Sequence, residues 1–157
     1  VFTDIDGVWT DGGMYYDQSG NELKRFHTYD GVGVHLAHQH GIKVGIITGE
    51  DTRIVTRRAE KLNVDFLYQG VNDKFAVLQE ICRTNRLNYD EVAYIGDDIN
   101  DMPILVSDIF SATPCTAPLY IQSCVNKVLQ NRGGDGVFRE FVEYIICQIN
   151  QEKIKYY

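Results

Sequence analysis

The chain has 157 residues, of which 44% are hydrophobic, and its formal net charge is -7. This length and composition suit a single domain with a full core, which we expect to span residues 1–157. The negative charge argues against a nucleic-acid-binding surface and no segment has the length of a membrane span, so we expect neither partner.

Short apolar runs alternate with helix-like patterns along the chain. The expected strands lie at residues 1–4, 43–47, 65–68, 91–95, 109–112 and, in a short final run, 127–129. The expected helices lie at residues 31–40, 51–62, 73–85, 101–106 and 135–148. This alternation predicts an α/β fold with a doubly wound, Rossmann-like parallel sheet. Because the first run begins at Val1, we expect a few residues to precede it in the whole protein.

Residues 13–27 interrupt the alternation. Residues 13–16 and 22–27 have the pattern of two antiparallel strands, and residues 17–21 between them have the composition of a turn. We therefore expect a small β-hairpin flap, and the chain has no room for a large cap domain. The apolar side chains of the hairpin are Met14, Tyr15, Tyr16 and Phe26. They suit either a subunit interface or packing on their own domain.

The first expected strand ends in two carboxylates one residue apart, Asp4 and Asp6. At the fraying end of a strand both can face one cavity, where their repulsion favours a bound cation or a proton. Carboxylate oxygens suit Mg²⁺, which commonly binds a substrate phosphate as well. Alone, the pair is more often explained as solvated turn residues, so its interpretation depends on the motifs downstream.

Two further motifs are compatible with phosphate binding. Thr48 and Gly49 follow the second expected strand, where a hydroxyl and an amide can hold a phosphate oxygen, although a helix cap also explains Thr48. Lys74 stands near the start of an amphipathic helical pattern, where a cation is mildly unfavourable. It is therefore either an ordinary surface lysine or one that meets an anion.

The fourth expected strand ends in glycine, followed by the carboxylates Asp97, Asp98 and Asp101. One aspartate would suffice to cap a helix, whereas three carboxylates close together after the end of an apolar strand are electrostatically costly without a metal. Ligands of doubly wound sheets bind beyond the carboxyl ends of the strands, where these acidic and hydroxyl motifs all fall. The pattern therefore indicates one common site.

Taken in order, these motifs resemble those of the haloacid dehalogenase (HAD) phosphohydrolases over nearly the whole chain. The opening Asp4-Ile5-Asp6-Gly7 continues into Asp11-Gly12, which resembles the capless subclass of phosphatases acting on sugar acid phosphates. Further matches include Lys24-Arg25-Phe26 and Arg132-Gly133-Gly134. The resemblance implies hydrolysis of a phosphomonoester through an aspartyl-phosphate, by a homotetramer in which neighbouring subunits complete the site.

The resemblance also implies a role for each residue. Asp4 would be the nucleophile and Asp6 the general acid and then the general base. Mg²⁺ would be held by Asp4, the backbone carbonyl of Asp6, and Asp97. The groups that bind phosphoryl oxygens would be Thr48, Gly49 and Lys74. Residues that orient water molecules or the lysine would be Asp98, Asn100 and Asp101.

Substrate choice depends on fewer residues. Glu50 stands where octulosonate phosphatases commonly carry arginine, and Trp9 stands where leucine is common. Both departures favour a nine-carbon ulosonate 9-phosphate (KDN or N-acylneuraminate type), with 3-deoxy-octulosonate 8-phosphate as the alternative. The basic residues predicted to contact the substrate, in their own or an adjacent subunit, are Arg58, Lys61 and Arg132. A solvated basic helix face is the alternative for the first two.

Another class of protein remains open at this point, an inactive HAD-fold oligomerisation module of a sugar-nucleotide synthetase. Loss of the nucleophile, the acid or the lysine would mark such a module, and all three residues are present here. A phosphotransferase would need a cap to exclude water. The four cysteines show no metal-like spacing, so we expect reduced thiols and a cytoplasmic location.

Overall fold

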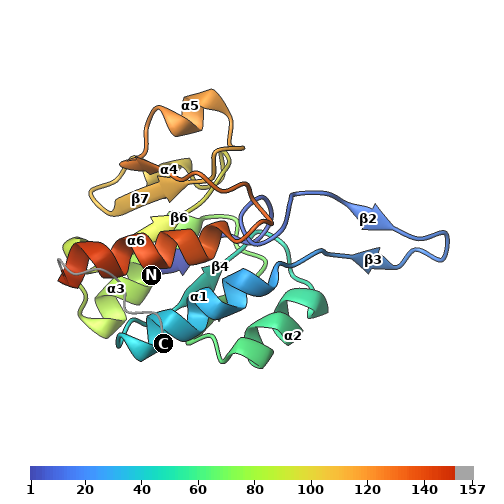
Figure 1. Ribbon diagram of the computed structural model, residues 1–157, viewed down its shortest axis with the longest axis horizontal. Helices are drawn as coiled ribbons and strands as arrows, with labels where there is room; N and C mark the ends of the chain where they lie inside the picture. The colour runs from blue at the N-terminus through green and yellow to red at the C-terminus, as the bar shows by residue number, and fades with distance from the viewer. Residues whose placement is uncertain (151–157) are drawn as a thin grey trace.

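A six-stranded parallel sheet forms the centre of the molecule, in the order β5-β4-β1-β6-β7-β8 (Figure 1). The computed structural model describes residues 1–150. The strands are β1 (Phe2–Thr3), β4 (Gly45–Ile47), β5 (Phe66–Tyr68), β6 (Ala93–Ile95), β7 (Phe110–Thr113) and β8 (Lys127–Val128). Every residue of β1, β4 and β6 is buried, as continuous apolar runs require. The predicted α/β fold with a doubly wound sheet is confirmed.

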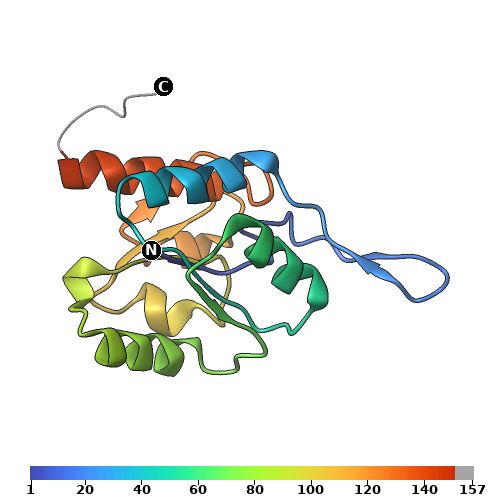
Figure 2. The ribbon, with the colours of Figure 1, turned by 90° about the horizontal axis from the view of Figure 1, so that it is seen from below.

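Helices cover both faces of this sheet (Figure 2). One core cluster contains buried side chains of α1 (Thr28–Gln39), α2 (Arg53–Leu62) and α6 (Val137–Asn150). The other contains buried side chains of α3 (Lys74–Asn85), α4 (Met102–Leu105) and α5 (Leu119–Gln122). Among residues 1–150, no helix is both long enough and apolar enough to cross a bilayer.

Helix α1 begins at Thr28, three residues before the predicted start. The His27 side chain accepts a hydrogen bond from the Tyr29 N–H at 3.1 Å, which caps the helix. Buried Asp30 then accepts hydrogen bonds from the Phe138 and Arg139 N–H groups at the start of α6. Tertiary contacts therefore set this boundary. The short helix α5 and the 3-10 turn Tyr89–Glu91 were not predicted either.

The predicted hairpin consists of β2 (Tyr15–Tyr16) and β3 (Glu22–Leu23), which pair antiparallel and project from the body of the molecule (Figure 1). Its exposed apolar side chains are Met14, Tyr15, Tyr16 and Leu23. Phe26 differs from them, because it packs partly buried against the first core cluster, with the Arg58 guanidinium 5.5 Å from its ring centroid. The Phe26 side chain therefore packs within its own domain.

Candidate active site

The predicted motifs converge at the carboxyl ends of β1, β4 and β6, which are neighbours in the sheet. A cavity of about 350 Å³ opens there. Its walls include Asp4 and Asp6 after β1, Thr48 and Gly49 after β4, and Asp97, Asp98 and Asn100 after β6. A larger, mainly apolar cavity of about 670 Å³ lies at the amino ends of the strands, far from these carboxylates.

Lys74, the first residue of α3, is fully buried beside the first motif. Its Nζ lies 2.8 Å from Asp4 Oδ2 and 2.8 Å from Asp101 Oδ1. Burial lowers the pKa of Lys74, but the two carboxylates outweigh it and raise that pKa above its usual value, so the ammonium stays charged. The explanation of Lys74 as a surface lysine is wrong.

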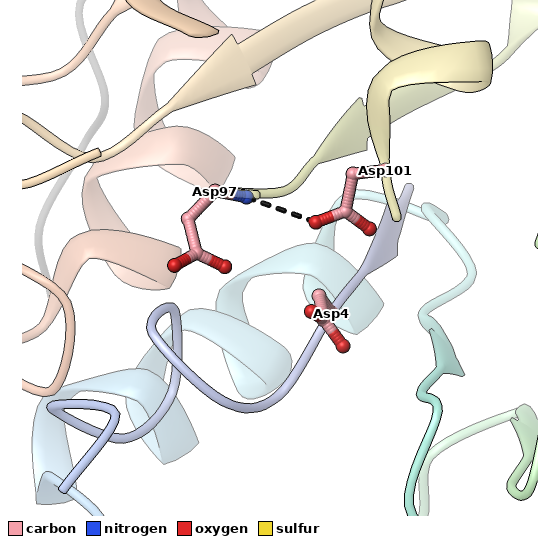
Figure 3. A group of neighbouring side chains, drawn as sticks. All are labelled: Asp4, Asp97 and Asp101. Atoms are coloured by element: carbon pink, nitrogen blue, oxygen red, sulfur yellow. Dashed lines mark hydrogen bonds between the residues drawn. The ribbon is translucent and has the colours of Figure 1, made fainter. Parts of the chain in front are cut away.

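Asp101 organises the loop after β6. Its Oδ1 accepts hydrogen bonds from Lys74 Nζ at 2.8 Å and from the Tyr94 hydroxyl at 2.6 Å. Its Oδ2 accepts from the N–H groups of Asp97 at 3.0 Å and Asp98 at 3.3 Å. Figure 3 shows the bond from Asp97. The Asp101 carboxylate thus holds both Lys74 and the loop, and buried Tyr94 is a member of this network that sequence analysis did not find.

Asp4 and Asp97 have the chemistry of metal ligands. Carboxylate oxygens of Asp4, Asp97 and Asp101 lie within 4.8 Å of one another (Figure 3). The pKa of Asp4 is raised to about 7, first by burial and then by the nearby charge of Asp101. The pKa of Asp97 is raised to about 8, first by burial and then by the nearby charge of Asp4. Among residues 1–150, buried Asp97 Oδ1 has no hydrogen-bond partner. Because Asp101 is already saturated by donors, the carboxylates of Asp4 and Asp97 are the ones that fit a divalent cation.

Asp6 is held from two sides. The Thr10 hydroxyl donates a hydrogen bond to Asp6 Oδ1 at 3.1 Å. Lys24, which follows β3 in the hairpin, places its Nζ 2.7 Å from both Asp6 oxygens and 2.7 Å from Glu50 Oε2. Sequence analysis did not assign Lys24 to the site, although the matched segment Lys24-Arg25-Phe26 was the available signal.

Thr48 and Gly49 face the cavity rather than capping a helix. The side chain that caps α2 is Thr52, whose hydroxyl accepts a hydrogen bond from the Val55 N–H at 3.3 Å. The cap explanation for Thr48 is therefore wrong. A Cβ atom added to Gly49 would meet no atom closer than the Val71 carbonyl oxygen at 3.8 Å, so the backbone there is open to a ligand.

Three basic residues predicted to contact the substrate do not line the cavity of their own chain. Arg58 donates a hydrogen bond to the His27 carbonyl at 3.1 Å and packs on Phe26, while Lys61 and Arg132 are exposed. Contact of Arg58 with a substrate in the same chain is therefore not supported. Contact with the site of an adjacent subunit stays a prediction for these residues.

The turn after Arg132 supports the first motif instead. The Gly134 N–H donates a hydrogen bond to the Val8 carbonyl at 2.9 Å. Gly133 packs so closely on Gly7 that an added Cβ atom would overlap the Gly7 carbonyl oxygen. Gly7 in turn has a φ of 84°, and its missing side chain leaves room for the Asp97 carboxylate.

Comparisons with known proteins agree with this geometry. The family model described as haloacid dehalogenase-like hydrolase matches residues 27–107. The 3-deoxy-D-manno-octulosonate 8-phosphate phosphatase of Haemophilus influenzae is 34% identical over 146 residues, which cover 93% of this chain and 81% of that protein. Its counterpart in Yersinia pestis is 34% identical over 155 residues, which cover 99% of this chain and 82% of that protein.

Solved structures are similar over almost the same length. The 3-deoxy-D-manno-octulosonate 8-phosphate phosphatase of Moraxella catarrhalis, in complex with a magnesium ion, a phosphate ion and KDO, has a TM-score of 0.89 and 31% identity. The match covers 92% of this chain and 83% of that one. A probable YrbI family phosphatase from Pseudomonas syringae has a TM-score of 0.92 and 36% identity, over 95% and 85% of the two chains.

Proposed function

Because the chain belongs to the haloacid dehalogenase-like hydrolases, we propose that it is a Mg²⁺-dependent phosphatase of a 2-keto-3-deoxy sugar acid phosphate. The observation that carries this proposal is the arrangement of Asp4 beside buried Lys74 and Asp97 at the mouth of one cavity. Relatives named as phosphatases, one of them described with bound magnesium and phosphate, support it.

For the substrate we propose 3-deoxy-D-manno-octulosonate 8-phosphate, because the relatives are named for it. They do not support the nine-carbon preference drawn from Trp9 and Glu50. Trp9 is fully buried and donates a hydrogen bond from its indole N–H to the Thr3 hydroxyl at 3.1 Å, so it does not reach the cavity. Glu50 does line the cavity and keeps a nine-carbon ulosonate 9-phosphate as the second candidate.

In the proposed reaction, an Asp4 oxygen attacks phosphorus and the bond to the sugar oxygen breaks, which leaves an aspartyl-phosphate. Asp6 gives its proton to the departing alkoxide and later takes a proton from the water that hydrolyses the acyl phosphate. Lys74 forms an ion pair with Asp4. Together with Thr48 and Gly49, it binds the phosphoryl oxygens. Mg²⁺, held by Asp4, Asp97 and the Asp6 backbone carbonyl, would supply neutralisation of phosphate charge.

The homotetramer is part of the same proposal. The hairpin exposes apolar side chains along its two strands, which suits contact with a second copy of the chain. The inactive-module alternative is not supported, because Asp4, Asp6 and Lys74 are present and converge on one site.

A phosphate-release panel tests the proposal. The purified protein is given eight- and nine-carbon ulosonate phosphates, glucose 6-phosphate and 4-nitrophenyl phosphate, each with Mg²⁺ or with EDTA. We expect Mg²⁺-dependent release that is fastest with the eight-carbon substrate. A higher kcat/KM with the nine-carbon compound would reverse the substrate assignment and leave the phosphatase proposal standing. Absence of Mg²⁺-dependent release from every compound would overturn the proposed function.

A further inference from the structure

We infer that Lys24 is a positioning residue, which holds the general acid Asp6 and the neighbouring Glu50 in place from the hairpin. This inference rests on the proposed function, because it concerns the residue that protonates the leaving group. It assigns to the hairpin a part in the chemistry of its own chain, in addition to any contact with another subunit.

The contacts of Lys24 connect three segments of the chain. Its side chain is only 2% exposed, although the hairpin that carries it projects from the molecule. Its Nζ lies 2.7 Å from each Asp6 oxygen, 2.7 Å from Glu50 Oε2 and 3.6 Å from Glu22 Oε1. Burial lowers the pKa of Lys24, but the hydrogen bonds that it donates to Asp6 and Glu50 raise that pKa above its ordinary value, so the ammonium is charged.

Asp6 has few other restraints. Apart from Lys24, its described side-chain partner is the Thr10 hydroxyl, and 31% of its side chain is exposed. A carboxylate held only by one hydroxyl can rotate, and a general acid acts within hydrogen-bond reach of the atom it protonates. The buried ammonium, bound to both oxygens, selects one rotamer, and when one oxygen carries the proton for the leaving group the ammonium keeps its bond to the other. Charge-assisted hydrogen bonds of this kind are among the strong ones in proteins.

The two buried lysines thus pair with different carboxylates of the site. Lys74 pairs with Asp4 and Asp101 on the side of the nucleophile. Lys24 pairs with Asp6 and Glu50 on the side of the leaving group. A change at Lys24 should therefore act on protonation of the leaving group more than on attack at phosphorus.

Two substrates separate these steps. A sugar alkoxide needs a proton in order to leave, whereas 4-nitrophenolate leaves readily without one. For both substrates kcat/KM reports the steps up to the first phosphoryl transfer, so slow hydrolysis of the aspartyl-phosphate does not affect the comparison. General acid catalysis typically contributes about 100- to 10,000-fold to the rate. Lys24→Met should therefore lower kcat/KM for the eight-carbon substrate by about 30-fold or more. For 4-nitrophenyl phosphate the loss should be less than about 5-fold.

Arg25 provides a matched control on the same hairpin. Its guanidinium lies 3.2 Å from Asp135 and 3.6 Å from Asp11, and its side chain is 52% exposed. Arg25→Met removes a neighbouring cation with two ion pairs but touches neither Asp6 nor Glu50. We expect it to change kcat/KM by less than about 3-fold, with the same ratio between the two substrates as wild type.

Two further variants distinguish positioning from a simple change of charge. Lys24→Arg keeps the cation and should recover part of the activity on the sugar phosphate. Lys24→Met combined with Glu50→Gln restores the net charge beside the cavity but not the contact with Asp6. Recovery of wild-type activity in this double variant would show that Lys24 acts only through its charge, and would overturn the inference.

Failure of the inference differs from failure of the proposed function. Equal losses on both substrates in Lys24→Met, or no loss on either, would overturn the role of Lys24 while wild-type Mg²⁺-dependent hydrolysis still supported a phosphatase. A crystal structure of Lys24→Met gives a test that needs no turnover. Displaced Asp6 and Glu50 carboxylates would support positioning, and unchanged carboxylates would contradict it.

Discussion

Replacement of Asp97 by asparagine should stabilise the metal-free protein at pH 8 and remove its response to Mg²⁺. Asp97 Oδ1 is buried without a hydrogen-bond partner in the described part of the chain, and the residue faces the charges of Asp4 and Asp101. An asparagine of the same shape carries no charge, and its amide can donate toward those carboxylates. The variant therefore removes repulsion but also a proposed metal ligand.

The size of the effect follows from the pKa. Burial, and next the charge of Asp4, raises the pKa of Asp97 from 3.8 to about 8. Asp97 binds its proton more tightly in the folded state than in the unfolded state. Its contribution to stability is therefore present at low pH and is lost as pH rises through its folded-state pKa. Each pH unit between the two pKa values corresponds to about 1.4 kcal/mol, which sets an upper bound of about 6 kcal/mol at pH 8. Because Asp97 lines an open cavity, we expect about 1–3 kcal/mol.

Urea denaturation of wild type and Asp97→Asn in EDTA, at pH 5 and pH 8, measures this difference. The variant should gain stability over wild type at pH 8, and the gain should shrink toward pH 5. Addition of Mg²⁺ at pH 8 should stabilise wild type much more than the variant. A variant that is no more stable than wild type at pH 8 in EDTA would refute the electrostatic reasoning. Equal Mg²⁺ stabilisation of both proteins would refute the assignment of Asp97 as a ligand.

Three further predictions concern other parts of the structure. Asp4→Asn should keep the fold by circular dichroism and lower Mg²⁺-dependent release from 4-nitrophenyl phosphate to background; substantial residual turnover would contradict the aspartyl-phosphate. Lys74→Met leaves two buried carboxylates without their cation, so urea denaturation in EDTA should show a loss of about 3–5 kcal/mol. Tyr15→Glu should shift light-scattering mass toward the monomer relative to wild type; an active wild-type monomer would exclude the tetramer.

Sequence patterns predicted the site well where it depends on strands. Apolar runs that end in Asp4, Thr48 and Asp97 mark the carboxyl ends of strands, and parallel strands bring such ends together. The start of α1 was harder to predict. It depends on the His27 cap and on buried Asp30, which accepts a hydrogen bond from the Phe138 N–H 108 positions further along the chain, and a local apolar pattern shows neither.

Lys24 could not be placed from the sequence for a different reason. Its contact with Asp6 depends on how the chain returns from the hairpin past the site, and strand alternation says only which face a residue occupies. The same limit applies to Arg58. Its spacing on a basic helix suggested a ligand contact, whereas the side chain turns to the His27 carbonyl at the base of the hairpin.

The contact between the loop after Asp6 and the turn at Gly133 has a consequence for protein synthesis. Every residue that lines the cavity precedes Asp101, whereas Gly133 and Gly134 support the loop from a segment made much later. The hydrogen bond from the Phe138 N–H to Asp30, across 108 positions, closes the same part of the fold. A growing chain therefore carries these cavity-lining groups before the turn at Gly133 and Gly134, which supports the loop after Asp6, has been made.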